Sequence, residues 1–161
     1  MCLTAISRAR HSSSSQITQP APINAGWVIC DEDEGRAREM AVRHIGAYWH
    51  SVVKHYELKG THLQTMKGYE SYGAMQQAVN APGGVDAMVE FFLGLQIWGT
   101  PEQCYEKIVN CTNRCGADTF SAVFSYGDMP YDYAEKNVRT FAAKVMPQLQ
   151  AYQRQMAVAA E

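Results

Sequence analysis

The sequence predicts an α/β fold made of repeated strand and helix units with parallel strands. Three observations carry this prediction: a short apolar run ends at Gly99, a well-marked helix follows it and ends at Gly116, and an alternating apolar segment begins at Thr119. Strand, helix and strand in this order form the parallel crossover unit of α/β proteins. The elements along the chain are assigned from local signals of the same kind.

Residues 1–22 differ in composition from the rest of the chain. They include consecutive serines from Ser12 to Ser15 and contain no acidic residue, so they offer nothing to build a core. We expect a disordered leader. An organelle transit peptide is the alternative, because such peptides are rich in Ser and Arg and poor in acids.

The folded domain is expected over residues 23–150, and its first strand at residues 27–30. This short apolar, β-prone run is followed at once by a group of acidic residues. Asp31 is the expected N-cap of a helix and Glu34 its capping-box partner. The other acids of the group favour the helix start through the macrodipole, and the helix should continue to about His55.

Periodicity weakens over residues 57–85, which contain repeated glycines and, at residues 67–72, aromatic side chains among small and charged ones. A connection of this length is commonly a functional loop or lid, and a variable surface excursion is the alternative. A short helix near residues 85–92 then leads into the strand at residues 95–98, which Gly99 breaks.

The helix expected over residues 101–115 has clear signals at both ends. Thr100 is a good N-cap, Pro101 suits the first helical position, and Gln103 completes a capping box. Gly116 supplies the left-handed residue that commonly ends a helix. One face is formed at steps of four, three and four by Cys104, Ile108, Cys111 and Cys115.

Residues 119–125 alternate with a period of two, which predicts a strand with one apolar face. Turn formers follow over residues 126–132, and a last helix begins at about Tyr133. Pro147 should end or kink that helix, because its ring removes a backbone donor. Residues 151–161 are expected to form a frayed tail.

Composition excludes several classes of protein. Fourteen basic against sixteen acidic residues give a formal charge of -2 with no basic stripe, so nothing points to nucleic acid or an anionic membrane as a partner. No apolar run reaches the length of a membrane-spanning helix. We therefore expect a protein that binds neither nucleic acid nor membrane.

The cysteines and histidines do not predict a metal site or a disulfide framework. The five cysteines form an odd set without a CxxC pair, which favours reduced core thiols and a cytoplasmic location. His44, His50 and His55 are spaced by six and five residues, so no two imidazoles meet as they would at i and i+4. We expect these histidines to be packed or solvent-facing, and no metal to bind.

An ordered set of short segments resembles a known family. The set consists of residues 27–34, 67–72, 98–103 and 116–118, and Phe141 with residues 145–147. In this order and spacing the segments resemble the C-terminal part of the luciferase-like, flavin-dependent monooxygenases. The resemblance covers roughly residues 20–150.

The resemblance implies the C-terminal portion of a (β/α)8 TIM-type barrel. In that family a reduced flavin, FMN in most members and a deazaflavin in some, reacts with molecular oxygen to oxidise a small organic substrate, and a flavin reductase supplies the cofactor. Barrel active sites lie at the carboxyl ends of the strands. The expected cofactor- or substrate-facing residues are Trp98, Gly99, Thr100, Ser125, Tyr126, Gly127 and Asp128.

The chain departs from this family in its length. A complete barrel takes about 250 residues and eight strands, and only three strands are predicted here, so the barrel is incomplete and no catalytic residue is carried over. Open strand edges should then make the chain self-associate or require a second polypeptide. The alternative is a non-catalytic, truncated relative that acts as an interaction module or has no independent function.

A free-standing doubly wound α/β binding domain is a third interpretation. It would require a glycine-rich phosphate loop between a strand and a helix, and no such loop occurs in the sequence.

Overall fold

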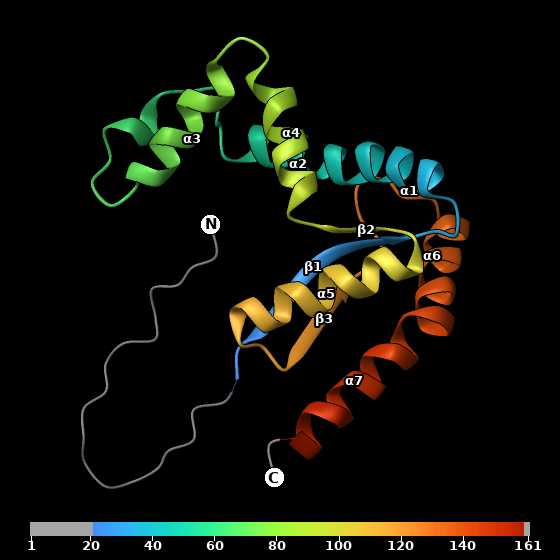
Figure 1. Cartoon of the computed structure of the whole chain (residues 1–161). Helices are drawn as coiled ribbons and strands as arrows, with labels where there is room; N and C mark the ends of the chain where they lie inside the picture. The colour runs from blue at the N-terminus through green and yellow to red at the C-terminus, as the bar shows by residue number, and fades with distance from the viewer. Residues whose placement is uncertain (1–20, 160–161) are drawn as a thin grey trace, which may run out of the picture.

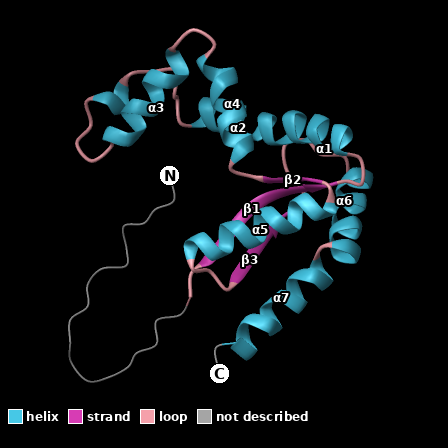
Figure 2. Ribbon diagram, viewed as in Figure 1, coloured by secondary structure: helices cyan, strands magenta, loops and turns pink. Residues whose placement is uncertain are grey.

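A computed structural model describes residues 21–159 of the chain. Within this range a three-stranded parallel sheet is surrounded by helices (Figures 1 and 2). The expected leader lies outside the described residues except for its last two. The elements in chain order are β1 Ile23–Cys30, α1 Glu34–Met40, η1 Ala41–Ile45, α2 Gly46–His55, η2 His62–Gln64, α3 Glu70–Asn80, α4 Gly84–Gly94, β2 Ile97–Gly99, α5 Pro101–Cys115, β3 Thr119–Val123, α6 Tyr131–Lys144 and α7 Met146–Ala159.

The prediction of an α/β fold with three parallel strands is confirmed, and the strand order adds a feature that the sequence did not predict. The order is β2-β1-β3, so the first strand is central. In a (β/α)8 barrel consecutive strands are neighbours, which would place β3 beside β2. In this chain β3 instead occupies the free edge of β1, with Ile23 opposite Thr119 and Trp27 opposite Val123.

This strand order places helices on both faces of the sheet. The first crossover, from β1 to β2, places α1, α2 and α4 over one face, and the second crosses back over β1 with α5 on the other. Two cores result. Ile29 packs with α1, α2 and α4, whereas Val28 and Cys30 pack with residues of α5 and α6. Such a two-sided arrangement is typical of doubly wound sheets.

The helix after β1 begins differently from the prediction. Asp33, not Asp31, is the N-cap, and its side chain accepts a hydrogen bond from the backbone nitrogen of Arg36. Asp31 is unsuitable as a cap because its carboxylate is already bound by other groups. The helix continues to His55 as predicted, through a π-helical stretch, η1. Such stretches inside helices occur frequently at functional sites.

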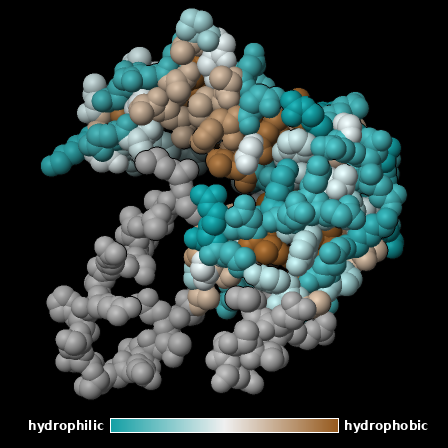
Figure 3. Space-filling view, viewed as in Figure 1, coloured by the Kyte–Doolittle hydropathy of each residue, from teal (hydrophilic) through white to brown (hydrophobic). Residues whose placement is uncertain are grey.

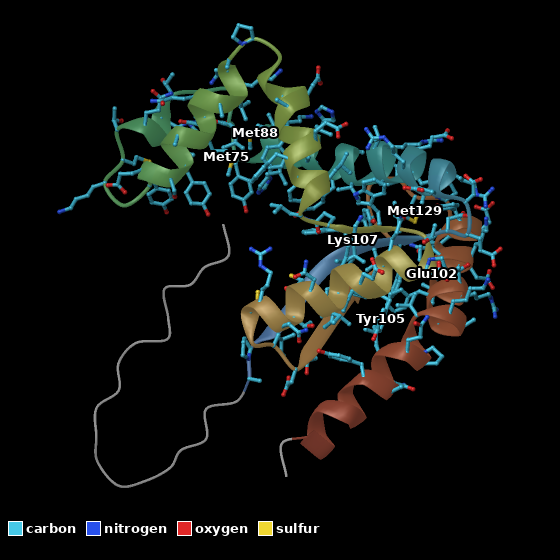
Figure 4. The ribbon with its side chains drawn as sticks, in the orientation of Figure 1. Met75, Met88, Glu102, Tyr105, Lys107 and Met129 are labelled. Carbon is cyan, nitrogen blue, oxygen red and sulfur yellow. The ribbon has the colours of Figure 1, made fainter. Side chains whose placement is uncertain are left out.

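The excursion over residues 57–85 contains a helix, α3, that the sequence did not predict. A buried glutamine holds the excursion together. Gln76 accepts a hydrogen bond from the backbone of Leu63 at 3.1 Å and donates one to the carbonyl of Glu57 at 3.3 Å. Met75 of α3 and Met88 of α4 lie between the two helices and pack against the same core (Figure 4). The excursion is thus ordered, and its helix α3 packs on η2 and α4 at a distance from the strands (Figure 1).

The predictions for α5 and β3 are confirmed almost residue for residue. Thr100 and Gln103 form the reciprocal capping box, and Gly116 ends α5 with a φ of 63°. On the helix face that the residue spacing predicts, Cys104 and Ile108 are buried, while Cys111 and Cys115 are half-buried. β3 ends two residues earlier than predicted because its partner residues on β1 end at Trp27.

The C-terminal region forms two helices. α6 starts two residues before the predicted Tyr133 and ends at Lys144, and Pro147 lies in the first turn of α7, where its missing N–H has little effect. Residues expected to form a frayed tail continue as helix to Ala159. Among residues 21–159, none of the helices is both long and apolar enough to cross a membrane.

Candidate functional site

The carboxyl ends of the three strands lie at one edge of the sheet because the strands are parallel. Asp31 follows β1, Thr100 follows β2, and the loop of residues 124–130 follows β3. The backbone nitrogen of Asp31 donates to the carbonyl of Gly99 at 3.1 Å, which joins the ends of β1 and β2. In doubly wound sheets ligands bind outside the carboxyl ends of two adjacent strands whose connections leave on opposite faces of the sheet. In this chain those two strands are β1 and β3.

A buried carboxylate lies at the centre of this edge. Asp31 is 1% exposed and pairs with the guanidinium of Arg36 and with the ammonium of Lys136, the latter at 3.0 Å. The backbone nitrogen of Asp33 donates to it as well, at 3.0 Å. Burial alone would raise the pKa of Asp31, but these hydrogen bonds outweigh burial and hold the pKa well below its usual range. Asp31 therefore remains charged and ties β1 to α1 and α6.

Beside this ion-pair cluster lie two buried polar atoms without a hydrogen-bond partner. His44, in η1, is 1% exposed, and its Nδ1 is 2.7 Å from the carbonyl oxygen of Gly127. Because a carbonyl oxygen only accepts, Nδ1 carries a proton and donates it to Gly127. Nε2 is one of the unpartnered atoms and the hydroxyl of Tyr133 is another. The two rings stack with centroids 6.4 Å apart.

Both unpartnered atoms are buried, so the partner that would satisfy either of them is an internal water molecule. Burial, together with the nearby carboxylate of Asp31, raises the pKa of Tyr133 to about 12, so its hydroxyl keeps the proton and acts as a donor.

The residues predicted after β2 have structural roles. The indole nitrogen of Trp98 donates to the carbonyl of Leu93 at 3.0 Å, and the ammonium of Lys107 lies 4.2 Å from the centre of its ring. Gly99 is buried with a φ of 138°, and Thr100 caps α5. These three residues shape the edge without facing open space.

The residues predicted after β3 divide into two pairs. Ser125 and Asp128 are exposed at the edge. Tyr126 donates its hydroxyl to the carbonyl of Val28 at 3.3 Å, and burial raises the pKa of this phenol. Gly127 contacts His44 so closely that a Cβ there would collide with the carbonyl oxygen of His44. The structure thus brings the residues predicted after β3 to the same edge as Asp31 and His44.

Sequence reasoning missed the roles of Asp31, His44, Tyr133 and Lys136. His44 is packed, which was one of its two expected states, while His50 and His55 are exposed. The acidic group after β1 was a usable signal for Asp31, but its pairing with a side chain 105 residues later leaves no local pattern. No group of metal-ligating side chains occurs among residues 21–159.

The larger cavity, about 900 Å³, lies along β3 between α5 and α7 and not at this edge. A smaller one of about 420 Å³ lies between the end of α2 and the excursion, next to Tyr69 and Tyr72. Figure 3 shows apolar surface over α4 and the adjoining part of α3. Phe91 of α4 and Leu95, which follows α4, are exposed.

A scan against protein-family models found no match for this sequence, and a search of curated proteins found no similar sequence.

The residues of this chain do not by themselves fit a flavin. Trp98 and Tyr126, the aromatic side chains among the expected cofactor- or substrate-facing residues, already make internal hydrogen bonds. Arg36 and Lys136, two cations at the edge, are paired with Asp31. The edge supplies at most one wall of such a site.

Proposed function

We propose that this chain is the C-terminal part of a luciferase-like, flavin-dependent monooxygenase, and that it binds reduced flavin only when another polypeptide completes a (β/α)8 barrel. The cofactor is FMN or a deazaflavin supplied by a flavin reductase, and the substrates are molecular oxygen and a small organic molecule. The free thiols of Cys30, Cys104 and Cys111 suit a cytoplasmic location.

The observation that carries the proposal is the gathering of polar groups at the carboxyl edge of a parallel sheet. Ser125 and Asp128 are exposed there, beside the unpartnered nitrogen of His44 and hydroxyl of Tyr133. The exposed side chains of Thr119, Ser121 and Val123 also support it, since a completing polypeptide would cover them. In that barrel β3 would leave β1 and lie beside β2.

A non-catalytic interaction module is the second candidate. It is favoured by the internal hydrogen bonds of Trp98 and Tyr126 and by the outer edge of β3, which pairs with no strand in the described part of the chain. Under this function the chain binds protein and no flavin in any assembly.

A flavin titration distinguishes the two candidates. Flavin fluorescence is followed as FMN or a deazaflavin is added to the chain alone and to the chain co-purified with a polypeptide that supplies the other barrel strands. We expect saturable binding only in the completed assembly. Asp128→Asn should weaken that binding, whereas the control Asp86→Asn, at an exposed site on α4, should not.

Tight binding by the chain alone would refute the need for completion. Absence of binding by a folded, completed assembly with both cofactors would refute the flavin proposal and favour the interaction module.

A further inference from the structure

The two outer edges of the sheet differ in how they are protected. The edge of β2 is three residues long, and the ammonium of Lys107 donates to the carbonyl of Trp98 at 2.6 Å (Figure 4). The edge of β3 is five residues long, and its sequence contains no charge, proline or glycine. Natural proteins protect exposed edges with lysines, prolines or bulges. β3 has none of these devices.

The larger cavity runs along this same unprotected strand. The side chains of β3 that face α5 and α7 are half-buried, while Thr119, Ser121 and Val123 on the opposite side are exposed. A strand added beside β3 would place every second side chain over the cavity, because side chains alternate between the two faces of a sheet. The lining is largely apolar and includes Ile108, Phe120, Ala122, Phe124, Phe141 and Leu149.

We propose that the outer edge of β3 pairs with β3 of a second copy of this chain, in antiparallel orientation and with Ser121 opposite the partner's Ser121. Two three-stranded sheets then join into one continuous sheet around a two-fold axis.

A second copy fits this edge better than other partners for two reasons. β3 is uncharged, so no like charges oppose its pairing with itself. It also carries apolar residues, Phe120 and Ala122, at the alternate positions that face the cavity. The two-fold axis places both cavities on the same side of the joined sheet, where each copy covers the other, as in an isologous interface. This pairing involves no flavin and does not depend on the proposed function.

Sedimentation equilibrium of the full chain over a wide concentration range tests the pairing. We expect a monomer–dimer equilibrium. Ser121→Lys and Ser121→Asp should each weaken the dimer by at least about fivefold, because like charges then face each other across the axis. A mixture of the two variants should restore association, since the charges become opposite. Gln77→Lys, at an exposed site on α3, is the control and should dimerise as the original chain does.

Far-UV circular dichroism establishes that each variant is folded, which is expected because Ser121 is exposed in the single chain. The proposal is overturned by a chain that stays monomeric at all concentrations, or by association that both charged variants leave unchanged. Failure of the mixture to associate would overturn the antiparallel register at Ser121.

Discussion

The side chain of Asn137 in α6 forms hydrogen bonds with the backbone at the end of β1, on the side where β3 no longer pairs with it. β3 pairs with β1 only as far as Trp27, so the backbone groups of β1 beyond it lack a ladder partner on that side. The side chain of Asn137, 1% exposed, fills this gap: its oxygen accepts from the backbone nitrogen of Cys30 at 2.8 Å, and its nitrogen donates to the carbonyl of Val28 at 2.7 Å. One amide thus fixes α6 to the central strand.

Asn137→Ala should lower the free energy of unfolding by about 2–4 kcal/mol. Each buried backbone group left without a partner costs about 1–3 kcal/mol, and two groups are affected. The lower part of the summed range applies because the carbonyl of Val28 also accepts from the hydroxyl of Tyr126. Urea unfolding at pH 7, followed by circular dichroism at one protein concentration, measures the change. A loss below about 1 kcal/mol would refute the reasoning.

Asn137→Asp adds a test that depends on pH. The carboxylate can still accept from Cys30, but its second oxygen faces the carbonyl of Val28 and can donate only when protonated. The pKa of Asp at this position should therefore be raised in the folded state. This variant should be least stable at high pH and regain stability as the pH falls through that raised pKa. Asn110→Asp, exposed on α5, is the matched control and should show no such recovery.

Three further predictions concern the same edge of the sheet. Gly127→Ala should lower the free energy of unfolding, measured in urea, by about 2–4 kcal/mol. Gly127 has a φ of 57°, and a Cβ at this position would collide with the carbonyl oxygen of His44. A loss under about 1 kcal/mol would contradict this close packing. Thr100→Ala should cost about 0.5–1 kcal/mol through loss of the α5 cap, measured in the same way, and an unchanged midpoint would show that the cap adds nothing. Asp31→Asn should lower the free energy of unfolding at neutral pH. Because the pKa of Asp31 is lowered in the folded state, the difference in unfolding free energy between the variant and the original chain should persist above about pH 4. This difference should disappear as the pH falls through the lowered pKa. A difference that stays constant down to pH 2 would contradict the role of the charged carboxylate.

The local signals for α5 were sufficient to predict it. Thr100, Gln103 and Gly116 act within one turn of the helix ends, so the residues that fix where α5 begins and ends are close together in the sequence. The alternation of β3 is equally local. By contrast, α3 is weakly amphipathic and contains a glycine, and its place depends on Gln76, whose partners lie before the helix in the chain.

The sequence by itself determined that the chain alternates strands and helices, where α5 and β3 lie, and which residues follow each strand. The tertiary structure decided the strand order and the partners of the buried polar groups. The reason is physical. The alternating pattern of β3 would be the same whether β3 lay beside β2 or beside β1, and the packing of α5 and α6 against β1 selects the position beside β1. Likewise, Asp31 meets Lys136 and Cys30 meets Asn137 across more than 100 residues, and contacts at that separation leave no periodic signal in the sequence.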